Sequence, residues 1–256
     1  MKKSTKTALV TGASKGIGRA YAKKLAQKGY NLVLIARSKD KLQEVKKECK
    51  TLTNEVIALA VDLTTPHIAQ DVFKTLARKK IVVDVLINNA GFGDYGSFSK
   101  SKISKQSEMI QLNITCLTEM SYAFLAQAST SKQTHLVNIG SVLSFIPSPF
   151  MSVYGATKAF VLSFSEALAA ELKGTKTAVT CICPGKTQSE FAKGANMPVF
   201  TDAPSAAELV EFAYEAMVEK EVVAVHGGDN RSVLLLPRLL PRSSVRNMMF
   251  KRMSGR

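Results

Sequence analysis

Tyr154 and Lys158 lie four positions apart in the stretch SVYGATKAF, which is otherwise made of small and apolar residues. On a helix this spacing places both side chains on one face. Such a pair is often an ordinary surface contact, but it can also do proton chemistry. A free phenol has a pKa of about 10, and a nearby ammonium lowers that pKa because it favours the phenolate. Tyr154 could then donate a proton to a carbonyl oxygen.

Ser141 is the second polar group that could act on the same oxygen. It ends an apolar run thirteen residues before Tyr154, and the intervening segment 142–153 is mostly apolar. A loop of that length can return Tyr154 to the side of Ser141, whose hydroxyl would hold the carbonyl oxygen. Asn113 lies in the helical segment MIQLNITCL, where Asn is a poor helix former. A buried amide needs hydrogen-bond partners, so Asn113 is either a satisfied core residue or a functional one.

A glycine-rich turn, TGASKGIG, spans residues 11–18 between an apolar run and a helical segment. Its glycines would let the backbone turn sharply and approach a ligand closely. The N-terminus of the following helix offers free N–H groups to a diphosphate. Alone, such a turn is as often structural, but its position after the first strand favours phosphate binding. We expect a dinucleotide to contact Gly12, Ser14, Lys15, Gly16, Ile17 and Gly18.

The end of the second apolar run, LIARSKDKL, bears on which dinucleotide is bound. An acidic residue there binds the ribose 2′-hydroxyl, whereas an arginine accommodates a 2′-phosphate. This chain has Arg37 and Ser38 at that point, with Lys41 one turn further and Lys15 in the glycine loop. Solvated surface cations are the alternative interpretation. The absence of a carboxylate at 36–38 favours NADP(H) over NAD.

Polar residues also end the third and fourth apolar runs. Asp62 and Leu63 end AVDL, and Asn89, Ala90 and Gly91 end VLINNAG. Each could be a plain turn. Aligned with the glycine loop, they are better explained as a wall that holds the adenine and its ribose.

Strand-like apolar runs alternate with helical segments along the whole chain. The expected strands cover 7–10, 31–36, 55–63, 82–91, 134–141, 176–185 and 221–227, and the longest expected helices cover 103–130, 153–174 and 204–220. This alternation predicts an α/β fold: one doubly wound Rossmann-like domain with a mostly parallel seven-stranded sheet and helices on both faces. Ligands of such sheets bind beyond the carboxyl ends of the strands.

Composition agrees with one globular domain. With 46% hydrophobic residues in 256, the chain can bury a single large core. No apolar run reaches the length of a signal-peptide core or a membrane span, so we expect a cytoplasmic protein. Three scattered histidines and four cysteines indicate no metal site and a reducing compartment. Cys181 and Cys183 are expected on opposite faces of their strand.

The C-terminal segment differs from the rest. Seven of the 35 basic residues, and no acidic residue, lie in 231–256, whereas the net charge of the whole chain is +15. We expect 1–230 to form the catalytic domain, with a substrate lid at about 188–204, and 231–256 to be a basic extension. Our first interpretation is a terminal helix that covers a neighbouring subunit or the sheet edge. Peripheral membrane contact is the alternative. Nucleic-acid binding lacks any reading element.

In this order and spacing, TGASKGIG, NNAG, Asn113, Ser141 and YGATK resemble the short-chain dehydrogenase/reductase family over about residues 6–227. The resemblance implies a catalytic set of Ser141, Tyr154 and Lys158, with Asn113 holding a water in a proton relay through Lys158. The PGKT turn is similar to the family's turn at the nicotinamide end, which adds Pro184, Gly185 and Thr187 to the cofactor contacts. A weaker similarity points to 17β-hydroxysteroid dehydrogenases and 3-ketoacyl reductases.

These observations predict an NADP(H)-dependent enzyme that reduces a carbonyl or oxidises a secondary alcohol. The residues expected at the substrate mouth are apolar (Phe92, Tyr95, 142–151 and 191–200), which favours a hydrophobic substrate. The resemblance implies a homodimer or homotetramer. A catalytically idle dinucleotide sensor or scaffold on the same fold is the alternative, and the intact catalytic set speaks against it.

Overall fold

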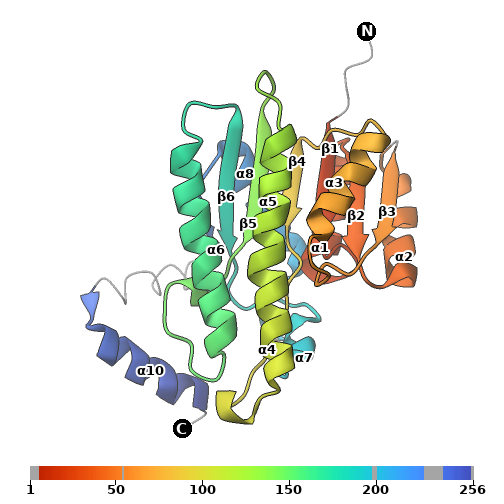
Figure 1. The fold of residues 1–256 in the computed structure, drawn as a ribbon. Coiled ribbons are helices and arrows are strands. Elements are labelled where there is room, and N and C mark those ends of the chain that lie inside the picture. Colours follow the sequence, from red (N-terminus) through yellow and green to blue (C-terminus); the bar gives the residue numbers. More distant parts are fainter. Residues whose placement is uncertain (1–5, 54, 198–200, 228–238, 255–256) are drawn as a thin grey trace.

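Seven parallel strands form the centre of the molecule, in the order β3-β2-β1-β4-β5-β6-β7 (Figure 1). The computed structural model describes residues 6–53, 55–197, 201–227 and 239–254. The strands are β1 Thr7–Thr11, β2 Asn31–Ala36, β3 Val56–Ala60, β4 Val85–Asn88, β5 Thr134–Ile139, β6 Thr177–Cys183 and β7 Val223–Val225. The predicted doubly wound α/β fold is confirmed.

Helices cover both faces of the sheet. They are α1 Gly16–Gln27, α2 Lys39–Lys50, α3 Ile68–Arg78, α4 Ile103–Ile110, α5 Leu117–Gln127, α6 Ser152–Glu171, α7 Phe191–Gly194, α8 Ala206–Glu219 and α10 Arg242–Ser254. Alternate strand residues divide the core: Ala8 and Val10 pack toward α1, α2 and α8, whereas Leu9 packs toward α3 and α5. Strands buried on both faces explain why their sequences are continuously apolar.

The predicted long helix at 103–130 is interrupted in its middle. A π-helical turn, Gln111–Cys116, joins α4 to α5, and Asn113 lies in it. Such turns occur often at functional sites, because the extra residue per turn re-aims the side chains around it.

Helix α10 packs on its own chain. Our first interpretation, that it covers a neighbouring subunit or the sheet edge, stays a prediction. The helix begins directly after Pro241, and its Val245 and Met249 pack on Ile146 of the loop after β5. Figure 1 shows the helix lying beside that loop, below α6. Its exposed surface carries Arg242, Arg246 and Lys251 among other residues. Vesicle contact stays a prediction, and no helix among the described residues is long and apolar enough to cross a bilayer.

The expectation for Cys181 and Cys183 was wrong. Residues two apart in a strand share a face, and the two Sγ atoms lie 3.8 Å apart. Both thiols are free and buried, and they pack against Gly140, where a Cβ would lie 3.0 Å from one sulfur and 3.1 Å from the other.

Candidate active site

A cleft of about 1700 Å³ runs along the carboxyl ends of the strands. It extends across the point where β1 and β4 are neighbours and the strand order reverses, which is where ligands bind in such sheets. Pockets for drug-sized ligands have volumes of roughly 300–1,000 Å³, so this cleft has room for a dinucleotide together with a substrate. Of the predicted site residues, the cleft is lined by Gly12, Ser14, Lys15, Gly16, Ile17, Arg37, Ser38, Asp62, Leu63, Asn89, Ala90, Gly91, Ser141, Tyr154, Lys158, Pro184, Gly185 and Thr187.

Two predicted site residues, Gly18 and Asn113, lie just behind this lining. A Cβ on Gly18 would lie 2.3 Å from the carbonyl oxygen of Gly12, so only glycine allows α1 to approach the turn this closely. Gly12 itself has φ +66°, in the left-handed region that favours glycine. These constraints fit a turn shaped to bring backbone N–H groups up to a diphosphate.

Asn89 stabilises the glycine turn from the neighbouring strand end. Its side-chain amide donates to the carbonyl oxygens of Thr11, at 2.9 Å, and Gly12, at 3.3 Å. The Thr11 hydroxyl in turn accepts from the backbone N–H groups of Asn89 and Ala90, both at 3.0 Å. We expected Asn89 to be part of a cofactor wall; it also holds the ends of β1 and β4 in register.

Carboxylates pair with the cations at the end of the cleft where we expected the adenosine of the dinucleotide. Arg37 Nη1 lies 3.4 Å from Glu108 Oε1 of α4. Lys15 and Lys41 share Glu190, at 3.3 Å and 3.6 Å. Lys15 holds the pKa of Glu190 below its usual value, mainly through their hydrogen bond. Sequence reasoning found the cations but missed Glu108 and Glu190, which come from distant segments.

Asp62 is the acidic group of this wall. It accepts hydrogen bonds from the backbone N–H (2.9 Å) and hydroxyl (2.7 Å) of Thr64. These bonds, the backbone one first, lower the pKa of the Asp62 carboxyl, and the charge of Arg37 acts in the same direction. Asp62 is therefore an ionised acceptor at the rim of the cleft.

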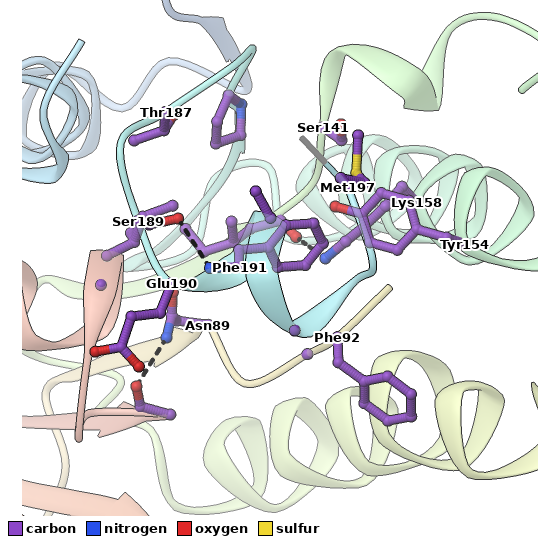
Figure 2. Close-up of a pocket in the computed structure, with 18 of the residues that line it drawn as sticks. Asn89, Phe92, Ser141, Tyr154, Lys158, Thr187, Ser189, Glu190, Phe191 and Met197 are labelled. Atoms are coloured by element: carbon purple, nitrogen blue, oxygen red, sulfur yellow. Dashed lines mark hydrogen bonds between the residues drawn. The ribbon is translucent and has the colours of Figure 1, made fainter. Parts of the chain in front are cut away.

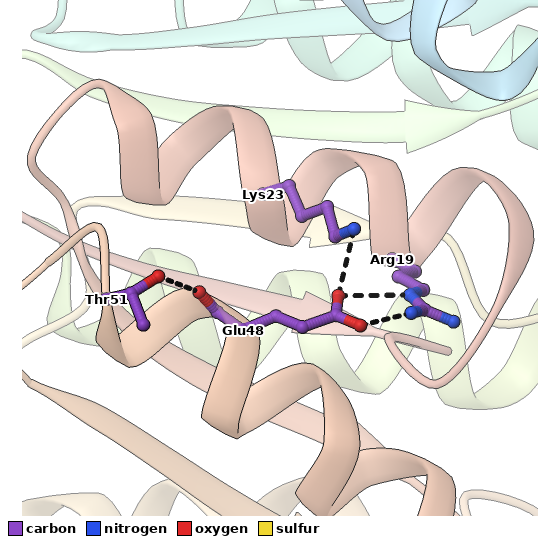
Figure 3. Close-up of polar contacts among 4 residues, drawn as sticks. All are labelled: Arg19, Lys23, Glu48 and Thr51. Carbon is purple, nitrogen blue, oxygen red and sulfur yellow. Dashed lines mark hydrogen bonds and ion pairs between the residues drawn. The ribbon is translucent and has the colours of Figure 1, made fainter.

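Ser141, Tyr154 and Lys158 converge on the other end of the cleft (Figure 2). Tyr154 is 7% exposed and Lys158 is 5% exposed. The Lys158 Nζ lies 5.7 Å from the centroid of the Tyr154 ring and donates a 2.7 Å hydrogen bond to the carbonyl oxygen of Ile139. The Ser144 hydroxyl links Ser141 to α6, because it accepts a hydrogen bond from the backbone N–H of Ser141 (3.2 Å) and donates one to the carbonyl oxygen of Lys158 (2.7 Å).

The titration of these groups differs from the sequence expectation. Burial raises the pKa of the Tyr154 phenol above its usual value, and a hydrogen bond with Ser141 opposes that rise. We expected the neighbouring ammonium to lower it. Burial also lowers the pKa of Lys158, to about 8, because a low-dielectric site disfavours the charged form of each group.

Asn113 is a satisfied buried residue next to this group. It is 1% exposed. Its side chain accepts from the backbone N–H of Phe92 (3.2 Å) and donates to the carbonyl oxygen of Phe92 (3.0 Å) and to the Thr157 hydroxyl (3.1 Å). Asn113 therefore connects three segments next to Lys158: the π-helical turn between α4 and α5, the loop after β4, and α6.

The substrate end of the cleft is apolar. Phe191 of α7 lies over Tyr154, with ring centroids 5.4 Å apart, and the two rings pack with the partly buried Phe92, Tyr95 and Met197. Of the predicted mouth residues, Phe92, Tyr95, Val142, Leu143, Ile146, Met151, Phe191, Ala192, Gly194 and Met197 line the cleft. Residues 198–200 of the predicted lid lie outside the described residues.

Several residues that line or support the cleft could not be predicted from local sequence patterns. Asp94 holds Lys105 at 2.6 Å and the amide of Asn196 at 3.0 Å, so it fastens the predicted lid to α4. The α10 residues Met249, Arg252, Met253 and Ser254 also line the cleft. A second buried polar chain, in which Asn88 donates to Asn138 and Asn138 to Ser165, joins β4, β5 and α6 below the site. No sequence signal connected these distant positions.

Comparison with known proteins identifies the class. The family model for short chain dehydrogenases matches residues 6–198. The very-long-chain 3-oxoacyl-CoA reductase of Kluyveromyces lactis is 33% identical over 78% of this chain and 60% of its own. Human 17-beta-hydroxysteroid dehydrogenase type 3 is 31% identical over 76% and 63%. The chain therefore belongs to the short-chain dehydrogenase family, as its motifs predicted.

A solved relative adds the cofactor class. The short-chain dehydrogenase from Sphingobium yanoikuyae in complex with NADPH superimposes with a TM-score of 0.80, at 33% identity, over 98% of this chain and 94% of that one. This protein is an oxidoreductase of alcohols and ketones whose cleft serves a nicotinamide dinucleotide.

Proposed function

We propose that this protein is an NADP(H)-dependent reductase of hydrophobic ketones or aldehydes, which also oxidises the corresponding alcohols. The observation that carries the proposal is the convergence of Ser141, Tyr154 and Lys158 at the apolar end of a cleft whose other end is lined by Lys15 and Arg37. One end has groups for proton transfer to oxygen, and the other has cations for a phosphate.

The residues divide the proton chemistry among them. A bound nicotinamide would supply or accept the hydride. Tyr154, which stays protonated at neutral pH because burial raises its pKa, donates its phenolic proton to the carbonyl oxygen. Ser141 holds that oxygen by a hydrogen bond. The Lys158 ammonium, held by the carbonyl of Ile139, stabilises the phenolate that remains.

The residues present fit a dinucleotide. The Gly12 and Gly18 positions leave no room for side chains beneath the turn, and α1 presents its N-terminus there. Arg37 directly follows β2, the position at which an arginine accommodates the 2′-phosphate of NADP, and no acidic residue stands at 36–38. Asp62 comes after β3 and not after β2. NADPH in the related Sphingobium yanoikuyae protein supports the same preference.

A hydrophobic substrate is supported by the packing at the mouth. The side chains around Tyr154 are aromatic, thioether and aliphatic groups from several segments, including Phe92, Met151 and Phe191. The names of the related reductases refer to long acyl chains and steroids, which are large apolar molecules. Apolar walls exclude water and favour such substrates.

The proposal includes a second copy of the chain as partner. Tyr122 of α5 is 78% exposed, and the stacked pair Phe160 and Phe164 lies on the neighbouring helix α6. Contiguous apolar patches on a surface mark association sites, and we propose that these aromatic side chains form one. Light scattering of the native protein and of Tyr122→Lys tests this: we expect an oligomer that the substitution weakens, and a monomeric native protein contradicts it.

The central experiment is a panel of aldehydes and ketones of graded chain length, assayed with NADPH and with NADH. We expect NADPH-dependent turnover that rises with chain length and is lost in Tyr154→Phe, while NADPH binding in that variant is retained. Full activity of Tyr154→Phe contradicts the mechanism. NADPH binding without turnover of any carbonyl would instead indicate the dinucleotide sensor or scaffold.

A further inference from the structure

Helix α10 is built into the substrate end of the cleft. Val245 and Met249 are buried against the loop after β5. Met253 packs in the cluster that contains Tyr154, and its backbone carbonyl accepts a hydrogen bond from the Tyr95 hydroxyl. The rings of Phe250 and Phe150 add a tilted contact at 5.6 Å. The last two turns of α10 are thus fixed as a wall of the cleft.

This wall contributes one charged side chain. Arg252 is exposed and lines the cleft, whereas the other cations of the helix, Arg242, Arg246 and Lys251, do not line it. The other α10 residues that line the cleft are Met249, Met253 and the uncharged Ser254, so Arg252 is the cation of this wall, next to the apolar cluster around Tyr154. Neither the proton chemistry nor the dinucleotide of the proposed function needs Arg252.

Among the described residues, Arg252 differs from several other cations of the cleft, because no carboxylate of these residues pairs with it. Lys105 is paired with Asp94, Arg37 with Glu108, and Lys15 and Lys41 with Glu190. Arg252 makes no ion pair with any carboxylate in the part of the chain that the structure describes. A planar guanidinium in this position suits a carboxylate or phosphate, which it binds with two parallel hydrogen bonds.

We propose that Arg252 binds an anionic group at the far end of the substrate, so that the substrate class is amphipathic: an apolar carbonyl compound with a carboxylate or phosphate at a distance from the carbonyl. The inference rests on the proposed function. The apolar chamber takes the body of the molecule, Tyr154 and Ser141 take the carbonyl oxygen, and Arg252 takes the anion.

The test compares ω-oxo acids of 6, 8, 10 and 12 carbons with their methyl esters, using NADPH. We expect the native enzyme to prefer the acid over the ester in kcat/KM by at least fivefold at the chain length that spans the two sites. Arg252→Met should lose this preference, Arg252→Lys should keep part of it, and Lys251→Met should keep all of it. Equal use of acid and ester by the native enzyme at every length, or an acid preference that survives Arg252→Met, overturns the proposal.

Binding without turnover separates this inference from the proposed function. Titration calorimetry with decanoate, decyl phosphate and methyl decanoate, in the presence of NADPH, needs no reaction. We expect the anions to bind at least fivefold more tightly than the ester, in an Arg252-dependent manner, and the tighter of the two anions identifies the head group. If the anions bind in this Arg252-dependent way but no carbonyl compound is reduced, the anion site is supported and the proposed reductase activity is contradicted. Equal binding of all three probes overturns the site itself.

Discussion

The Lys15 ammonium lies 3.3 Å from the Glu190 carboxylate, and Lys41 approaches the same carboxylate to 3.6 Å. Lys15 precedes α1, whereas Glu190 directly precedes α7 in the predicted substrate lid. A carboxylate of the lid therefore occupies cations that the proposed 2′-phosphate would use. NADPH and Glu190 should compete for the same charges.

Glu190→Gln should consequently bind NADPH more tightly. Exposed ion pairs are worth about 0.2–1 kcal/mol, so we expect a gain of up to about fivefold in affinity, with NADH nearly unchanged. NADPH fluorescence titration measures this affinity. The gain should shrink in about 0.5 M salt, because salt screens the interaction between exposed charges. Glu211→Gln removes a surface carboxylate that is paired with Lys24 away from the cleft, and it is the matched control. Weaker NADPH binding by Glu190→Gln contradicts the competition.

Arg37→Ala should separate the two dinucleotides. The guanidinium is expected to pair with the 2′-phosphate, so its loss should raise the Kd for NADPH by about tenfold or more, which corresponds to roughly 1.4 kcal/mol. The Kd for NADH should change by less than about twofold. Lys39→Ala, at an exposed position outside the cleft lining, should leave both values unchanged. An equal loss of affinity for NADPH and NADH would contradict a specific contact between Arg37 and the 2′-phosphate.

The pH profile of carbonyl reduction should fall above about pH 8. Burial lowers the pKa of Lys158 to about 8, so its ammonium loses a proton there, whereas the raised pKa of Tyr154 keeps the phenol protonated. The profile of kcat/KM reports the free enzyme. NADPH binding measured over the same pH range distinguishes this loss from loss of cofactor. A profile that stays flat to pH 10 contradicts the assignment.

His135 of β5 should make the fold sensitive to acid. Burial lowers its pKa to about 4, and its Nδ1 has no hydrogen-bond partner in the described structure. The unfolded chain takes up this proton at about pH 6.5, so the stabilisation is present above that pH and is lost as pH falls toward 4. We expect the native protein to lose about 3 kcal/mol more than His135→Gln between pH 7 and 4. Denaturant unfolding at both pH values measures the free energy of unfolding. An equal loss in the native protein and in His135→Gln would show that His135 is not the source of the acid sensitivity.

Most of the fold and part of the site geometry were predictable because their signals are local. Apolar runs and turns give the strand–helix alternation, and in a parallel sheet the strand ends must meet at one edge. Gly12, Arg37 and Ser141 each come just after a strand, so their convergence required only that topology. Tyr154 lies in α6, and the loop between β5 and α6 returns it to Ser141. Spacing also placed Tyr154 and Lys158 on one face of α6.

The missed contacts depend on segments whose relative positions no local pattern determines. Glu190 meets Lys15 across 175 residues of chain, and Tyr95 meets Met253 across 158. The raised pKa of Tyr154 depends on how deeply it is buried, which its neighbours in sequence do not reveal. For Cys181 and Cys183 the sequence sufficed, because strand periodicity requires a shared face.

The π-helical turn at Gln111–Cys116 sets the angular phase between α4 and α5. In an α-helix each residue advances the helix by roughly 100°, so deleting one residue in this turn would rotate everything on one side of it by that angle. Asn113 could not then reach Phe92 and Thr157 while Phe124 of α5 also kept its place in the core. The six-residue turn therefore acts as a fixed spacer, and the number of residues in it is constrained by the contacts on both sides.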